Sequence, residues 1–117
     1  MKSIFAQYGA VASNLLPKTS TPTIGVLGCS VIDSVAYVVF DVTNNDDSTA
    51  DIDVSYSPDF TSPSSLSVAS SADGSFQLVA SGNPPGSTTV YARATASGKV
   101  VSNTTSRTQN IIACIGE

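Results

Sequence analysis

The chain has 117 residues, of which 41% are hydrophobic and 12% are charged, and its net charge is −4. This length fits one domain with a modest core. The five cations are scattered along the chain, which argues against binding to nucleic acid, and no apolar run is long enough to span a membrane. We therefore expect one folded domain, with neither nucleic acid nor membrane as its partner.

The chain opens with a leader, residues 1–23, which contains Pro17 and Pro22 and precedes the domain expected at 24–117. Its large apolar residues follow helical spacing, which predicts a short amphipathic helix ending at Pro17 or, as the alternative, an extended arm. These residues are Ile4, Phe5, Tyr8, Val11 and Leu15. We expect this docking arm to be buried against a partner subunit, so a chain without Met1–Pro22 should fold but no longer assemble.

From Ile24 onward the hydrophobic pattern has a period of two, which is typical of β-strands with one buried face. The stretches SVAYVVFDVTN (34–44) and ADIDVSYS (50–57) predict a hairpin joined by the turn residues NNDDST. Its inward residues are expected to be Ala36, Val38, Phe40, Val42, Ala50, Ile52, Val54 and Tyr56. Its outward residues are expected to be Val35, Tyr37, Val39, Asp41, Thr43, Asp51, Asp53, Ser55 and Ser57.

Further strands are predicted at LSVAS (66–70), SFQLVAS (75–81) and VYARATAS (90–97), and a last one between Val101 and Cys114. With IGVLGCSVI near the start, they make about seven short strands, which is the pattern of an antiparallel β-sandwich. The predicted core consists of Phe40, Val42, Ile52, Val54, Phe76, Leu78, Val90, Ala92 and Ala94. The residues predicted to be exposed are Asp51, Asp53, Arg93 and Thr95.

The stretch VYARATASGKVVSNTTS resembles the sixth strand, the following turn and the start of the seventh strand of fibronectin type III domains. SVAYVVFDVTNND followed by ADIDVSYSPD is similar to the second and third strands of that family. The resemblance covers Thr23 to about Ile112 and implies an all-β, two-sheet immunoglobulin-like sandwich with an N-terminal arm. The chain has no tryptophan, and Thr88 stands where the family's corner tyrosine is expected. A related immunoglobulin-like sandwich with different strand edges is therefore the alternative.

Catalysis is not expected from this composition. The chain contains no histidine, and its only glutamate is Glu117. Only Asp, Tyr or Lys could act as a general acid or base, and these residues are not spaced in the sequence like a catalytic motif. We therefore predict a protein that is not an enzyme and needs no cofactor.

Acidic residues are concentrated between Asp41 and Asp59. Carboxylates are hard oxygen ligands, so Asp46, Asp47 and Asp51 are a candidate calcium site. The alternative interpretation, and the one we adopt, is a solvated edge that holds no metal and discourages edge-to-edge pairing of sheets.

The fibronectin-like topology also makes a prediction about two loops. Asn44–Thr49 and Ser97–Ser102 should lie at the same end of the sandwich, which brings Lys99 toward the acidic residues. As an exposed ion pair, such a contact would contribute no more than about 1 kcal/mol.

The two cysteines, Cys29 and Cys114, lie near opposite ends of the chain. A sandwich could bring its first and last strands together and allow a disulfide between them. Two buried thiols acting as small apolar residues are the alternative.

Three further residues are candidates for contact with a partner. Tyr37, Tyr91 and Arg93 are expected to face outward, and aromatic and arginine side chains are common anchors of interfaces. Ordinary cross-strand pairing is the alternative role for each of them.

A sandwich preceded by an apolar leader is expected to work by docking. This plan resembles the small accessory proteins of tailed-bacteriophage particles, which implies a capsid decoration or cement subunit, or else a tail or neck component. Its partners would be other virion structural proteins, and the displayed domain could touch cell-surface carbohydrate. The competing hypothesis is an exported, extracellular or cell-surface adhesion module that binds carbohydrate or protein.

Overall fold

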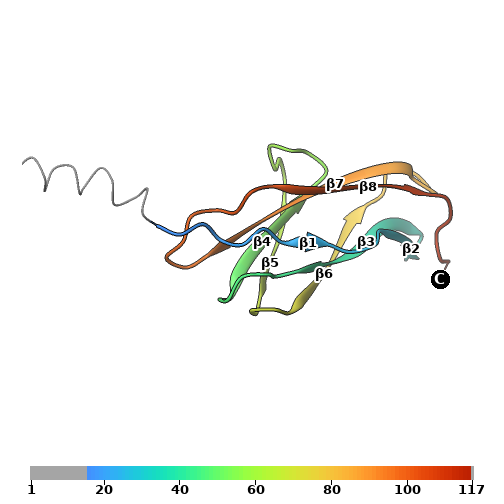
Figure 1. The fold of residues 1–117 in the computed structure, drawn as a ribbon. Helices are drawn as coiled ribbons and strands as arrows, with labels where there is room; N and C mark the ends of the chain where they lie inside the picture. The colour runs from blue at the N-terminus through green and yellow to red at the C-terminus, as the bar shows by residue number, and fades with distance from the viewer. Residues whose placement is uncertain (1–15, 117) are drawn as a thin grey trace, which may run out of the picture.

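The computed structural model describes residues 16–116, and the regular elements in that range are strands without any helix. They are β1 (Thr23–Ile24), β2 (Gly28–Ile32), β3 (Val35–Thr43), β4 (Ala50–Ser55), β5 (Ser64–Val68), β6 (Asp73–Val79), β7 (Gly86–Ala96) and β8 (Thr105–Ile111). One antiparallel sheet has β3 at its centre, with β1 and β2 along one edge and β6 along the other. The second antiparallel sheet has the order β5-β4-β7-β8. The predicted all-β class with two packed sheets is therefore confirmed (Figure 1).

The strands number eight within residues 16–116, not about seven, because the first predicted strand is interrupted between β1 and β2. At the break Leu27 is buried, and a side chain of β8 replaces the missing ladder bonds. The Leu27 N–H donates to Gln109 Oε1 at 3.0 Å, and Gln109 Nε2 donates to the Leu27 carbonyl at 2.6 Å. The break thus links the two sheets along one side of the sandwich.

The core lies between the sheets, where the inward residues of the strands meet. Val42, Ile52, Val54, Val90, Ala92 and Ala94 are 0% exposed, and Phe40 and Phe76 are at most 7% exposed. The two phenylalanine rings stack with centroids 5.9 Å apart. Small alanines from β7 and large rings from the other sheet fill the space together, as close packing requires. The predicted core is confirmed except for Leu78, which is half-buried at the end of β6.

The predicted burial is wrong at the end of β4, although the side chains still alternate there. Ser55 is buried and Tyr56 is 41% exposed, the reverse of the expectation. After β4 the chain folds back over the outer face of its sheet, and Ser55 Oγ donates to the Thr61 carbonyl at 3.0 Å. Tyr56 reaches the other sheet instead, where its hydroxyl donates to the Val79 carbonyl at 2.8 Å. Burial differs from the alternation here because the following loop covers Ser55, while Tyr56 lies at the edge of the space between the sheets.

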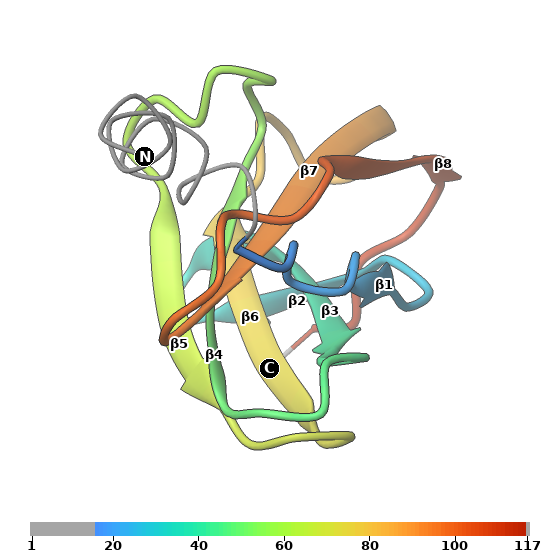
Figure 2. The same ribbon diagram turned by 60° about the vertical axis from the view of Figure 1, so that its left-hand side comes forward.

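The loops 44–49 and 97–102 lie at the same end of the sandwich, as predicted, and we call this end the Lys99 pole (Figures 1 and 2). Lys99 Nζ lies 2.8 Å from Asp46 Oδ2 and 2.7 Å from Asp47 Oδ1. The pair with Asp46 is not exposed as expected, because Asp46 is 2% exposed, whereas Asp47 is exposed. The C-terminus and β2 lie toward the opposite end.

Candidate functional site

The outer face of the sheet around β3 carries several exposed apolar side chains. Tyr37 pairs with Ser30 of β2 and with Val79 of β6, and Ser30 also forms a parallel bridge with Ile115. Paired residues in neighbouring strands point to the same face, so Tyr37, Val79 and Ile115 form one row across the sheet. Ile32 and Val35 form the next row, which also points outward.

We call this surface the apolar face, and it consists of Val26, Ile32, Val35, Tyr37, Val39, Val79 and Ile115. Ile115 is 77% exposed, Val26 is 69% exposed and Val79 is 61% exposed. Exposed apolar side chains grouped in this way mark binding surfaces on soluble proteins, whereas isolated ones need no explanation. The apolar face is therefore the candidate interaction site.

The apolar face is hollowed beside Val26 and Val39. The hollow has a volume of about 450 Å³, and its lining continues along β3 and β6 to Asp41, Ser75 and Gln77. Asp41 accepts a 2.8 Å hydrogen bond from Ser75 Oγ. One end of the hollow thus carries the two valines beside Gln77, which pairs with Val39, while its other end carries a carboxylate.

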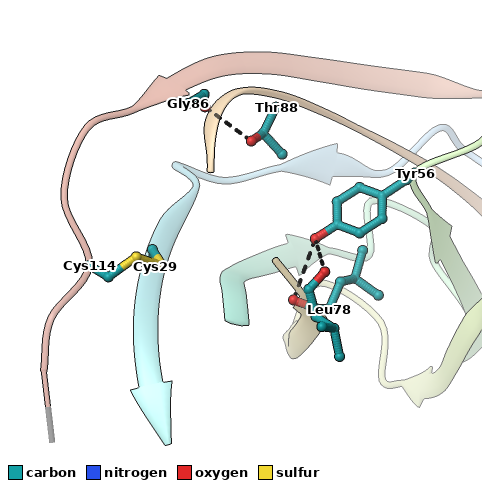
Figure 3. Close-up of a disulfide and its surroundings, with 7 residues drawn as sticks. Cys29, Tyr56, Leu78, Gly86, Thr88 and Cys114 are labelled. Carbon is teal, nitrogen blue, oxygen red and sulfur yellow. Dashed lines mark hydrogen bonds between the residues drawn. A yellow bond between two sulfur atoms is a disulfide. The ribbon is translucent and has the colours of Figure 1, made fainter. Parts of the chain in front are cut away.

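The C-terminal segment is held against β2 by a disulfide between Cys29 and Cys114 (Figure 3). Beside it, the Ile115 N–H donates to the Cys29 carbonyl and the Val31 N–H donates to the Ile115 carbonyl, both at 2.9 Å. The sequence allowed two alternatives for these cysteines, a disulfide or two buried thiols. The structure contains the disulfide. The bridge has a direct consequence for the site, because it fixes Ile115 on the apolar face.

Of the three predicted anchor residues, only Tyr37 belongs to the apolar face. Tyr91 and Arg93 lie on β7, on the outer face of the other sheet, and both are half-buried. Arg93 Nε lies 3.1 Å from Asp53 Oδ2, and its guanidinium stacks 4.2 Å from the Phe60 ring centroid. The expected exposure of Arg93 and Asp53 is therefore wrong, because they pair with each other across β7 and β4. This pairing fits the cross-strand role of Arg93.

Asp46 connects three segments at the Lys99 pole. Its Oδ2 accepts from Lys99 Nζ, and its Oδ1 accepts from the Ser20 N–H at 2.9 Å. The hydrogen bond from Lys99, followed by the one from Ser20, lowers the pKa of Asp46 to about 2. The same contacts with Asp46 and Asp47 raise the pKa of Lys99.

The calcium candidate residues are not assembled into a ligand set. The carboxylates of Asp46 and Asp47 bond Lys99, whereas Asp51 lies on the exposed face of β4 opposite Thr95. Among residues 16–116, no three acidic, histidine or cysteine side chains are grouped so that they could hold a metal ion.

The apolar residues of the predicted arm, Ile4 to Leu15, lie outside the described residues. The second part of the leader is bonded to the sandwich at the Lys99 pole. Thr19 is 1% exposed, its N–H donates to the Val100 carbonyl at 2.9 Å, and its Oγ1 accepts from the Ala96 N–H at 3.0 Å. Removing Met1–Pro22 would also remove these bonds, so we expect that truncation to lower the stability of the sandwich.

A second hollow, of about 300 Å³, lies near the start of β7. It is lined by Tyr56, Ser81, Ser87, Thr88 and Thr89. The Tyr56 hydroxyl is bonded to the end of β6, and burial raises its pKa (Figure 3). The ring is thereby fixed at the rim of a hollow rich in hydroxyl groups.

Comparison with protein-family profiles, with curated proteins and with solved structures finds no match for this chain. In the part of the chain that the structure describes, no helix is long and apolar enough to cross a membrane.

Proposed function

We propose that the protein is a non-enzymatic structural subunit of a bacteriophage virion, a capsid decoration or cement subunit or a tail or neck component. The observation that carries the proposal is the apolar face. It lies on the outside of a sandwich whose core is already filled, so its side chains contribute little to folding of the single chain. A surface of this kind gains most from contact with another subunit.

The strand order supports an immunoglobulin-like sandwich. In such domains the first, second and fifth strands share a sheet, and the third, sixth and seventh strands form the other. If β1 and β2 are counted as one interrupted first strand, then β3 and β6 are the second and fifth strands. β4, β7 and β8 are the third, sixth and seventh strands, and the fourth strand, β5, pairs with the third. This strand order is the one expected of a fibronectin-like domain, and such a domain would suit the display role we propose.

The disulfide supports a location outside the reducing cytosol. Disulfides persist in oxidising surroundings, which include secreted proteins and the surfaces of virions and cells. The bridge between Cys29 and Cys114 joins the first and last parts of the sandwich. A subunit displayed on a particle would keep this bond after release from the host cell.

The test is to locate the protein in fractions of the source culture. We expect it in particles purified on a density gradient, at a fixed ratio to the main shell or tail protein, as measured by quantitative mass spectrometry. Treatment of the particles with a mild denaturant should release it without opening the nucleic-acid-filled shell if it decorates the outside. Recovery only in the medium or on cell surfaces would contradict the proposal.

The hollow at Tyr56 favours the second candidate, an exported adhesion module that binds carbohydrate. Sugars commonly contact an aromatic ring and several hydroxyl groups, and this hollow offers both. The same fractionation distinguishes the two candidates, because an adhesion module would be found with the cell surface. Tyr56→Ala would then reduce binding to immobilised cell-wall glycans, while Tyr37→Ala would leave it unchanged.

A further inference from the structure

We propose that the apolar face binds the leader of a second copy of this chain, residues 1–15, so that copies are joined by exchange of their arms. The inference deepens the proposed function by naming one partner of the subunit. It rests on that function only in treating the leader as a docking arm, and it can be tested on the purified chain alone.

The arm and the apolar face match in composition. The arm carries Ile4, Phe5, Tyr8, Val11 and Leu15, and its only charged side chain is Lys2. The apolar face contains no charged side chain, and the carboxylate of Asp41 lies at the far end of its hollow. The four cations of the described range lie elsewhere, two at the Lys99 pole and two on the other sheet. The arm and the face are therefore complementary in both polarity and charge.

The shape of the apolar face also suits a single segment with large side chains. The hollow of about 450 Å³ beside Val26 and Val39 is within the size range of pockets that accept bulky groups. The flat face of another sheet would leave it empty, and an empty hollow loses the dispersion contacts that its lining could make. Large side chains projecting from a single segment, such as Phe5 and Tyr8, can enter it.

The point where the arm joins the described chain and the apolar face of the same copy lie apart. Thr23 of β1 pairs with Thr43, at the end of β3 that leads to the Lys99 pole. From there the segment 16–22 runs lengthwise away from β1 (Figure 1). At the rise of an extended chain, these residues span about 20 Å. The nearest part of the apolar face, at Val26, lies three residues beyond Thr23 in the opposite direction, which is about 10 Å of extended chain.

A helical arm of 15 residues would be only about 22 Å long, which is shorter than the sum of these distances. A fully extended arm could span about 50 Å, but then only its first residues would reach the face and Val11 and Leu15 would lie away from it. A second copy of the chain can bring its own apolar face within reach of the whole arm. In an antiparallel pair, the Lys99 pole of one copy lies beside the apolar face of the other, and each arm can reach the partner's face.

The experiment uses two full-length variants that each lose one half of the contact. Val79→Asp places a charge at the β6 edge of the apolar face, beside Tyr37, and leaves the arm intact. Phe5→Asp combined with Tyr8→Asp disrupts the arm and leaves the face intact. Sedimentation velocity should show wild-type dimers or longer species that depend on concentration, and each variant alone should be monomeric or associate at least about tenfold more weakly.

The decisive measurement is the mixture of the two variants. The intact arm of the Val79→Asp chain should bind the intact face of the other variant, so the mixture should form a one-to-one complex although neither variant associates alone. Formation of this complex also proves that both variants fold. Val26→Asp serves as a second face variant, and Val101→Asp, at a valine that is 43% exposed outside the apolar face, is the matched control and should associate like wild type.

Three results would overturn the inference. An arm variant that still associates alone would mean that the faces pair with each other, and variants that form no complex in the mixture would mean that the arm binds within its own chain. Wild-type chain that remains monomeric at every concentration would also reject it. The last result would leave the proposed function standing if the protein is still found in purified particles, so the two ideas can fail separately.

Discussion

Asp46 lies in a loop, yet it is almost fully buried and bonds segments from three parts of the chain. Besides Lys99 and Ser20, its Oδ2 accepts from the Ser48 N–H at 3.2 Å. Its main-chain carbonyl accepts from Ser70 Oγ at 2.8 Å. A single carboxylate thus holds together the acidic loop, the loop of Lys99 and the segment that leads out of the leader. We expect its ionisation to control the stability of the whole Lys99 pole.

This residue gives a prediction about pH. The pKa of Asp46 falls from its ordinary value of 3.8 to about 2 in the folded chain. A lowered folded-state pKa contributes stability that is fully present above about pH 4 and is lost as the pH falls through about 2. Urea denaturation at several pH values should therefore show a smaller loss of unfolding free energy between pH 4 and 2 for Asp46→Asn than for wild type.

The control for this measurement is Asp47→Asn. Asp47 contacts the same Lys99 Nζ, but its side chain is 87% exposed. Its variant should follow the wild-type pH profile closely, because a solvent-screened contact contributes little. Equal profiles for Asp46→Asn and wild type would show that the buried pair does not stabilise the fold.

At the scale of elements, the gap between β1 and β2 is held by a side chain of β8 in place of a strand ladder. Arg107, two residues before Gln109, adds a longer contact to the Ile24 carbonyl at 3.4 Å. Side chains that satisfy buried main-chain groups are costly to remove, because both groups are then left without partners. The gap therefore depends on one residue of β8 more than on the strand residues that flank it.

Gln109→Ala should lower the free energy of unfolding by about 1 to 3 kcal/mol. It should also speed hydrogen exchange at the Leu27 amide, which now donates to Gln109 Oε1. The matched control is Asn110→Ala, one residue further along β8 and exposed, which should change neither quantity measurably. Unchanged exchange at Leu27 in the Gln109 variant would mean that the gap is held by other contacts.

At the scale of the whole molecule, the disulfide closes most of the sandwich into one loop. Its two cysteines are 85 residues apart in sequence, and Cys114 ties the C-terminal segment to β2. A crosslink over so long a loop removes much of the freedom of the unfolded chain. It also holds Ile115 in the row of the apolar face. The same bond therefore stabilises the fold and positions a residue of the candidate interaction surface.

Replacing both cysteines by alanine should lower the free energy of unfolding by about 4 to 5 kcal/mol on the chain-entropy account. The wild-type chain treated with a thiol reductant should show the same urea midpoint as this variant. Release of Ile115 should also weaken association of the purified chain. A reduced protein that keeps the oxidised midpoint would show that the bridge adds nothing to stability.

The sequence by itself determined the strands and the faces that they bury. Alternation is a local property, because successive side chains of a strand point to opposite sides, and so Val42, Ile52 and Ala92 could be placed in the core from their neighbours alone. The same alternation placed Tyr37 outward between Val35 and Val39. Three outward apolar residues on one strand were the signal in the sequence for a binding face, although the sequence could not identify which residues of other strands complete it.

Only the tertiary structure decided the features that depend on contacts between distant segments. Ser55 is buried because the chain after β4 folds back over its own sheet, and Ile115 reaches the apolar face because a disulfide holds it beside β2. Arg93 is half-buried because the same connection that covers Ser55 places Phe60 over its guanidinium. These positions are set by loop paths and by pairings between residues far apart in sequence, and alternation along a single strand carries no information about either.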